Sequence, residues 1–336
     1  MDYALMQVAE KTLEITRLEK YSLDMKTVAL VKRNELPFSE VKIFSPTLLE
    51  KIYTGIYYPK FRYEKEKYAK IKVVEKDSFE AARSLENPLV MNFASATHKG
   101  GGFLSGSHAQ EESLCRCSTL YASLTAETAQ RYYDYNRSLH SPLYSDYMLL
   151  SPNVCVFRDA RLNLLADPYN VAVATVPAPN LRSIRVDKAE LTLMMLRRIR
   201  YFLSMVSANG YKNLVLGAWG CGAFRHNPYD VAEYFHKVLM DEGFAVLFDN
   251  VLFAIVKSEE NLIAFKSTFS AKNNNALTAL RKKENKEIIM HLYSIEKIAK
   301  IKCSRCENLL GCLGCNINEL KQDLDHAKEL MRFQND

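Results

Sequence analysis

The chain has 336 residues, of which 48% are hydrophobic and 25% charged, and it carries a formal net charge of +6. This composition is that of a globular protein with a sizeable core, long enough for one large domain or two smaller ones. The longest apolar runs, such as residues 171–179 and 251–256, are too short to cross a bilayer, and residues 1–22 lack the apolar stretch of a secretory signal. We therefore expect a cytoplasmic protein, and the mild positive charge suits an anionic small ligand as well as nucleic acid.

The first 84 residues predict helices and short strands but show no catalytic pattern. Apolar residues at helical spacing predict an amphipathic helix from residue 3 to about residue 23. Strands are expected at residues 27–31 and 70–74. A helix over residues 45–53 starts at Ser45-Pro46, where serine can cap the free amides and proline sacrifices none.

Residues 92–124 join a buried strand to a glycine-rich loop and then to the acidic start of a helix. A short apolar run ends at Asn92, and Gly100, Gly101 and Gly102 then remove three consecutive Cβ atoms. Such a loop lets backbone amides approach a bulky or anionic group. Directly after it, the helix is expected to begin at Gln110, Glu111 and Glu112, because apolar residues recur at helical spacing from Leu114 to Leu124.

The second half of the chain alternates strands and helices. Strands are expected at residues 148–150, 154–157, 170–179, 213–217 and 251–256, and helices at residues 191–206 and 230–242. This alternation predicts an α/β fold with a mixed sheet. After the strand at 213–217 comes a second glycine-rich loop, with Gly217, Gly220 and Gly222. It matches neither the dinucleotide fingerprint nor the P-loop.

These two segments together resemble a known family. Gly100-Gly101-Gly102, a spacer over 103–109 and then Gln-Glu-Glu resemble the signature of the bacterial-type poly(ADP-ribose) glycohydrolases, a branch of the macrodomain superfamily. Gly-Ala-Trp-Gly-Cys-Gly at 217–222 is similar to the phosphate-binding loop of that family. The resemblance covers about residues 5–257. It implies a macrodomain-like three-layer α/β/α sandwich, with residues 1–84 as an accessory part and 85–258 as the catalytic core.

The resemblance also implies an activity, the hydrolysis of ribose–ribose O-glycosidic bonds in poly(ADP-ribose) with release of ADP-ribose. Glycosidases commonly use two carboxylates, but neighbours on a helix point about 100° apart, so the two glutamates are expected to divide the work. By the resemblance, Glu112 is the acid and then the base, and Glu111 hydrogen-bonds the ribose and sets the position of Glu112. A helix N-terminus favours an ionised carboxylate, so we expect Glu112 to gain its proton largely when substrate binds.

The remaining site residues are also carried over from the family, which needs no cofactor for catalysis. Asn92 is expected to hold the distal ribose. The glycines at 100–102 and the loop at 220–223 are expected to hold the diphosphate from two sides, and Phe224 to lie against the ligand. The predicted substrate-binding residues are Asn92, Gly100, Gly101, Gly102, Gln110, Gly220, Cys221, Gly222, Ala223 and Phe224.

The eight cysteines form two groups. Cys115, Cys117, Cys155 and Cys221 are expected to be small buried hydrophobes in a reducing compartment. The other four, Cys303, Cys306, Cys312 and Cys315, fall in a helical C-terminal extension, residues 259–336, with the spacing C-x2-C-x5-C-x2-C. Paired C-x2-C knuckles favour a structural zinc site, with disulfides or redox thiols and an iron–sulfur cluster as alternatives.

Two further classes of function stay open from the residues alone. The chain could bind ADP-ribose without cleaving it, or release only single ADP-ribosyl groups from proteins. Alternatively, the cysteine-rich extension could make the chain a nucleic-acid or protein adaptor, because residues 281–305 hold eight Lys or Arg against three Glu. Two glutamates favour the enzyme, since binding alone would need only the loops.

Overall fold

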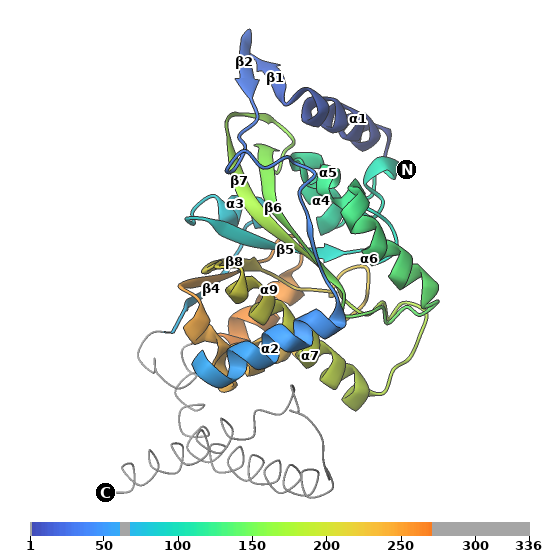
Figure 1. Cartoon of the computed structure of the whole chain (residues 1–336), viewed down its shortest axis with the longest axis vertical. Coiled ribbons are helices and arrows are strands. Elements are labelled where there is room, and N and C mark those ends of the chain that lie inside the picture. The colour runs from blue at the N-terminus through green and yellow to red at the C-terminus, as the bar shows by residue number, and fades with distance from the viewer. Residues whose placement is uncertain (1, 61–67, 271–336) are drawn as a thin grey trace, which may run out of the picture. The chain divides into compact units, whose positions relative to one another are not determined.

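The computed structural model describes residues 2–60 and 68–270 (Figure 1). One compact unit spans Met1–Asn273, and Asn274–Asp336 is a second unit. The four cysteines of the predicted zinc site lie outside the described residues. No helix in the described part of the chain is long and apolar enough to cross a membrane.

The fold is built on a seven-stranded mixed sheet, which confirms the predicted fold class. Its order is β3-β6-β7-β5-β8-β9-β4; β3 and β6 and also β6 and β7 pair antiparallel, and all other neighbours are parallel. The strands are β3 Lys42–Phe44, β4 Lys70–Val74, β5 Pro88–Ala94, β6 Met148–Arg158, β7 Leu164–Pro177, β8 Asn213–Leu216 and β9 Asn250–Ala254. Since β3 and β4 precede residue 85, the expected accessory part and core share one sheet.

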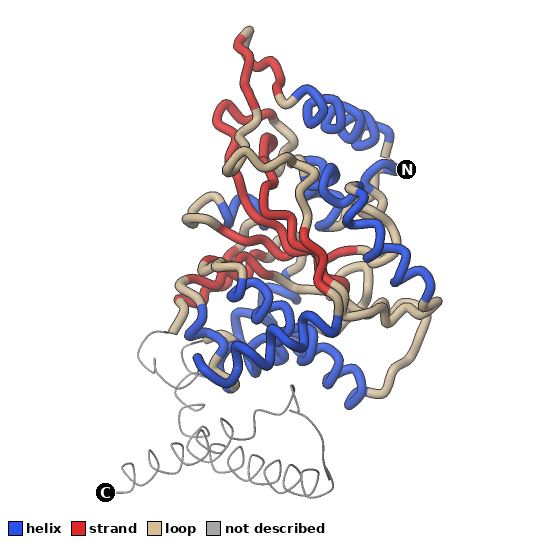
Figure 2. Tube along the Cα trace, in the orientation of Figure 1, coloured by secondary structure: helices blue, strands red, loops and turns tan. Residues whose placement is uncertain are grey.

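Helices cover both faces of this sheet (Figure 2). Along β5, Leu89 and Met91 belong to one core cluster and Val90 to the other, as the two-residue period of a strand requires. The first cluster includes side chains of α2 Pro46–Lys60, α7 Lys188–Ala208, α8 Pro228–His236 and α9 Glu259–Thr268. The second includes side chains of α1 Tyr3–Leu18, α3 Ser78–Ala82, α4 Gln110–Cys117, α5 Leu120–Thr125 and α6 Glu127–Ser138. The result is a three-layer sandwich.

Residues 259–270 pack with this sandwich. Phe265 of α9 is fully buried in the first core cluster, and the Thr268 hydroxyl donates to Glu233 of α8 at 3.3 Å. The sequence placed these residues in the C-terminal extension, because the composition changes after residue 257. In the structure, the apolar positions of α9 therefore complete the core.

The first helix ends earlier than its periodicity predicts. The expected helix ran to about residue 23, but Glu19 takes a left-handed conformation (φ 55°) and ends α1 at Leu18. The following residues form a two-stranded hairpin, β1 Lys20–Leu23 and β2 Lys26–Ala29. The local reason is the burial of Tyr21 against Phe157 of β6, a contact between residues far apart in sequence.

Other helix and strand boundaries also differ from the predicted ones, because of strand pairing and local backbone geometry. The helix expected from the glutamates to Leu124 is two helices, because Ser118 is extended and bridges to Val156. The two strands expected at 148–157 are one strand, β6, with a register shift after Ser151. The helix expected over 230–242 is α8 followed by a short π-helix, η2 Lys237–Asp241. Short 3₁₀ turns, η1 Phe103–Ser105 and η3 Phe244–Leu247, complete the described elements.

Candidate active site

The candidate site lies at the carboxyl edge of three neighbouring parallel strands. β5 pairs with β7 on one side and with β8 on the other, and Ala94 lies opposite Pro177 where β5 and β7 end. The two glycine-rich loops follow β5 and β8, so the fold brings them to the same edge. This is where open α/β sheets bind ligands.

The start of α4 is tied to β5 by the side chain of Gln110. Its amide oxygen accepts from the Phe93 N–H at 2.9 Å, and its amide nitrogen donates to the Met91 carbonyl at 2.8 Å and to the Ser78 hydroxyl at 3.1 Å. The sequence assigns Gln110 to substrate binding. In the structure, its amide bonds to backbone groups of β5 and so sets where the two glutamates begin.

Glu111 is buried and held at both carboxyl oxygens. Oε2 accepts from the Ser95 N–H at 2.7 Å, and Oε1 accepts from the Asn92 side-chain amide at 3.2 Å. Burial raises the pKa of the Glu111 carboxyl to about 8, although these two hydrogen bonds act in the opposite direction. Desolvation therefore outweighs donors that favour the ionised form. The negative charge of Glu112 adds to the rise.

Glu112 is also buried, but only one of its carboxyl oxygens is held. Oε1 accepts from the Gly102 N–H at 2.8 Å, whereas Oε2 is buried and has no hydrogen-bond partner within the described residues. The glycine loop lies directly against both carboxyl groups. A Cβ at Gly101 would lie 2.5 Å from Oε1 of Glu112 and 3.1 Å from Oε2 of Glu111. Gly101 also has φ +58°, so only glycine meets both demands.

Asn92 belongs to β5, and its side chain is fully buried. The predicted strand stopped at this residue, but β5 continues to Ala94. The Asn92 amide nitrogen donates to Glu111 and to the Thr175 hydroxyl, both at 3.2 Å, and its amide oxygen has no partner in the described structure. Asn92 therefore positions Glu111 and keeps one polar atom free.

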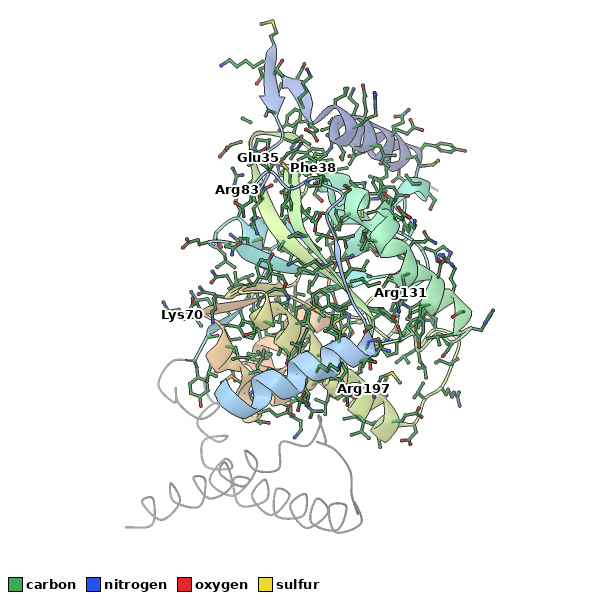
Figure 3. All side chains as sticks on the ribbon, viewed as in Figure 1. Glu35, Phe38, Lys70, Arg83, Arg131 and Arg197 are labelled. Atoms are coloured by element: carbon green, nitrogen blue, oxygen red, sulfur yellow. The ribbon has the colours of Figure 1, made fainter. Side chains whose placement is uncertain are left out.

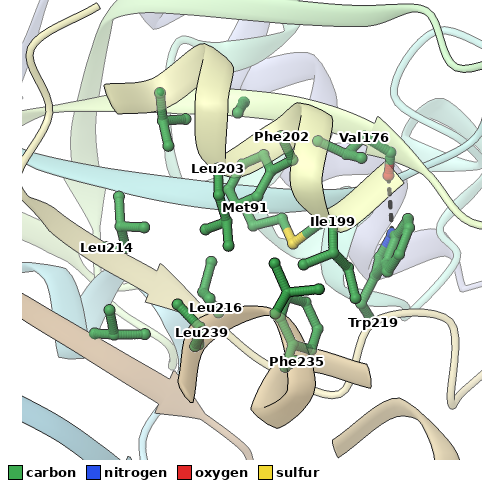
Figure 4. Close-up of a cluster of buried hydrophobic side chains, with 14 of the residues drawn as sticks. Met91, Val176, Ile199, Phe202, Leu203, Leu214, Leu216, Trp219, Phe235 and Leu239 are labelled. Carbon is green, nitrogen blue, oxygen red and sulfur yellow. Dashed lines mark hydrogen bonds between the residues drawn. The ribbon is translucent and has the colours of Figure 1, made fainter. Parts of the chain in front are cut away.

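The second glycine-rich loop is anchored by Trp219. This side chain is fully buried, and its Nε1–H donates to the Val176 carbonyl of β7 at 3.0 Å (Figure 4). Gly220 follows with φ +79°, and a Cβ there would lie 2.6 Å from the ring of His226. The His226 Nε2 is 2.7 Å from the Pro179 carbonyl, which can only accept, so Nε2 carries the hydrogen.

The tip of this loop offers free backbone donors. Among the described residues, the N–H groups of Gly222, Ala223 and Phe224 donate to no protein acceptor. Successive free amides at a strand-to-helix connection form an anion-binding nest, and α8 begins shortly afterwards at Pro228 with Asn227 as its cap. The predicted role of residues 220–223 in diphosphate binding fits these donors.

The sequence did not predict a role for Tyr144 or Arg198, which both lie near the site. The Phe224 ring packs against Tyr144, with ring centroids 6.1 Å apart. The buried guanidinium of Arg198 donates to the carbonyls of Leu143 and Tyr144. The only sequence signals were an arginine on the apolar stretch of a predicted helix and a tyrosine in a loop, and neither is specific.

The described residues show no group of three or more His, Cys, Asp or Glu side chains able to hold a metal. Cys115, Cys117 and Cys155 are buried free thiols, as expected, and Cys221 is partly buried and free. Burial raises the pKa of Cys221 to about 12, so this thiol is not a ready nucleophile.

Comparison with known proteins agrees with this geometry. Residues 9–159 match the family model described as microbial-type PARG, catalytic domain. The structure is similar to poly(ADP-ribose) glycohydrolase (PARG) from Thermomonospora curvata, with 35% identity, a TM-score of 0.73, and coverage of 80% of this chain and 100% of that one. The same enzyme bound to the inhibitor ADP-HPD gives 35% identity, a TM-score of 0.71 and the same coverage.

PARG from Deinococcus radiodurans in complex with ADP-ribose is a further similar structure. It shares 36% identity at a TM-score of 0.62, with coverage of 69% of this chain and 94% of that one. A search of curated proteins found no match.

The family match and the similarity to solved glycohydrolases place the chain among the hydrolases of the glycosidase class, on an α/β sandwich. The chain belongs to the microbial-type poly(ADP-ribose) glycohydrolase family.

Proposed function

We propose that this chain hydrolyses the ribose–ribose O-glycosidic bonds of poly(ADP-ribose) from chain ends, with Glu112 as acid and base. One observation carries the proposal. Glu112 has one carboxyl oxygen fixed by the Gly102 N–H and one buried oxygen without a partner among the described residues, whereas both oxygens of Glu111 are held. Glu112 is therefore the carboxyl group with an oxygen available for the scissile bond.

The reaction follows from this arrangement. Glu112 donates its proton to the leaving ribose oxygen while the glycosidic C–O bond breaks and positive charge develops on the other ribosyl ring. The carboxylate so formed then takes a proton from water, whose oxygen bonds to the ribosyl carbon. Glu112 is thereby protonated again, and ADP-ribose is released. Glu111 supports this cycle by fixing the start of α4 through Ser95 and Asn92.

Binding of the ADP-ribose unit is assigned to the two loops. The free amides at residues 222–224 suit the negatively charged diphosphate, and residues 100–102 pass along its other side. Asn92 has a free amide oxygen that could accept from a hydroxyl of the distal ribose. The relatives solved with ADP-ribose and with ADP-HPD support this choice of ligand.

The test compares substrates for the wild type and for Glu112→Ala. The wild type should release ADP-ribose from poly(ADP-ribose), and Glu112→Ala should lose about 100-fold or more in kcat, the usual contribution of general acid–base catalysis. Release from singly ADP-ribosylated protein alone would contradict polymer hydrolysis. Tight ADP-ribose binding with no release from either substrate would make the chain a binding module.

For the C-terminal extension beyond α9, we propose that Cys303, Cys306, Cys312 and Cys315 hold one structural zinc ion, and that residues 271–336 contact nucleic acid or a protein partner. The C-x2-C spacing supports the metal, and the basic residues of 281–305 support the partner. Free thiols throughout the described structure fit a cytoplasmic location. Metal analysis of the full chain should find one zinc; less than about half an equivalent would contradict the site.

A further inference from the structure

Tyr144 lies at the same sheet edge as the catalytic loops. It precedes β6, which runs antiparallel to β7, so the start of β6 lies beside the end of β7; Leu149 pairs with Thr175. Tyr144 packs against the core cluster on the α6 face, whereas Phe224 packs against the cluster on the α7 face. Their rings meet at 6.1 Å with planes tilted by 48°. This aromatic pair therefore spans the edge where the two cores meet.

The backbone of Tyr144 is held in a conformation that tyrosine rarely adopts. Its φ is +58°, in the left-handed region, where a residue with a Cβ is strained by about 1–2 kcal/mol. Strained residues persist only where the surrounding structure over-determines them, and they cluster at functional sites. The next residue is fixed too, since both the N–H and the hydroxyl of Ser145 donate to Oδ1 of Asn136.

Arg198 supplies the restraint on Tyr144. Its side chain is 1% exposed, and Nη2 donates to the carbonyls of Leu143 at 2.7 Å and Tyr144 at 2.9 Å. Nη1 donates to the Pro177 carbonyl at 3.1 Å, at the end of β7, and Nε donates to Asp146 at 2.7 Å. One buried guanidinium thus ties α7 to the strand end beside the site and to the Tyr144 loop.

The segment that Arg198 binds at Pro177 is also hydrogen-bonded to the second glycine-rich loop. The segment after β7 accepts from His226 at Pro179, and its Leu181 N–H donates to the Phe224 carbonyl at 3.1 Å. The position of Phe224 is therefore set through a segment that begins at Pro177, where Arg198 is bound.

We infer that Tyr144 forms, with Phe224, an aromatic wall against the distal ribose of ADP-ribose, and that Arg198 is the positioning residue of this wall. The inference rests on the proposed function and names a further contact of the same site. An aromatic face is suited to a sugar ring because it adds apolar area at little cost in side-chain entropy. Such a pair favours a ligand with a ribosyl end over one that ends at its diphosphate.

The test measures the affinity of the full chain for ADP-ribose and for ADP by calorimetry. Tyr144→Ala should weaken ADP-ribose binding about tenfold or more, the usual effect of losing an aromatic face, and should change ADP binding less than about twofold. Tyr144→Phe keeps the ring and should bind like the wild type. Tyr135→Ala, a tyrosine on α6 that is 42% exposed, is the matched control and should also bind like the wild type.

Two results would overturn the inference while leaving the proposed function intact: unchanged ADP-ribose affinity in Tyr144→Ala, or an equal loss for ADP and ADP-ribose. A wild type that binds neither ligand would instead contradict the proposed function. The role of Arg198 is tested by a double-mutant cycle with Arg198→Lys, or with Asp146→Asn if the lysine variant does not fold. Adding Tyr144→Ala to either should cause little further loss, and fully additive losses would refute the positioning role.

Discussion

Replacing Gly101 by alanine should separate catalysis from stability. The new Cβ would lie 2.5 Å from Oε1 of Glu112, where ordinary contact begins at 3.4 Å, so the carboxyl group must move by about 0.9 Å. That movement also breaks the bond from the Gly102 N–H, which fixes Glu112. A displacement of about 1 Å at a reacting group can cost about 100-fold in rate. We therefore expect Gly101→Ala to lower kcat about 100-fold.

The same substitution also carries a backbone cost, which needs its own control. Alanine at a left-handed φ costs about 1–2 kcal/mol, and about 2–4 °C in Tm for each kcal/mol in a domain of this size. Gly210, between α7 and β8, has φ +83° and nothing within 4 Å of a Cβ. Gly210→Ala should therefore lower Tm similarly and leave kcat unchanged.

The assay is steady-state release of ADP-ribose from poly(ADP-ribose), with Tm measured by calorimetry on the same samples. A Gly101→Ala enzyme with wild-type kcat would show that the position of the Glu112 carboxyl group does not matter for catalysis, contrary to this expectation. Equal losses of kcat in the two glycine variants would refute it as well, since the loss would then come from destabilisation alone.

Two other predictions concern residues that support the site. The pKa of Glu111 is raised to about 8 in the folded chain, above its ordinary 4.5, so the folded state holds a proton that the unfolded state releases. The free energy of unfolding should therefore fall as pH rises from about 4.5 to 8, by up to about 1.4 kcal/mol per pH unit. Glu111→Gln should flatten this slope, measured by urea unfolding at pH 5 and 8. An unchanged slope would contradict the effect of burial on the Glu111 pKa. Trp219→Phe removes the buried hydrogen bond to the Val176 carbonyl, so it should cost about 1–3 kcal/mol of stability and weaken ADP-ribose binding. Unchanged affinity would show that the loop does not need this anchor.

The two loops could be predicted from sequence because their signals are local. Three consecutive glycines and a Gln-Glu-Glu helix start are contiguous, and the order of strand, loop and helix around them follows from short apolar patterns. The different hydrogen-bond partners of the two glutamates also follow from helix geometry, since the side chains of neighbours diverge by about 100°. The fold class follows from the alternation of strands and helices.

The supporting residues could not be predicted because their partners meet only in the folded chain. The Gln110 amide donates to the Met91 carbonyl of β5, 19 residues away in sequence. The Arg198 guanidinium donates to the carbonyls of residues 143, 144 and 177. An arginine on an apolar helix stripe carries no sign of such partners. The early end of α1 has the same origin, since Tyr21 leaves the helix to pack against Phe157.

The most direct test of the central claim is the rate of ADP-ribose release by Glu112→Gln, measured together with its affinity for ADP-ribose. Glutamine keeps the shape of the side chain and can still accept from the Gly102 N–H, but it cannot exchange a proton. We expect a loss of about 100-fold or more in kcat, with the dissociation constant for ADP-ribose unchanged within about threefold. A Glu112→Gln enzyme that releases ADP-ribose at the wild-type rate would contradict it.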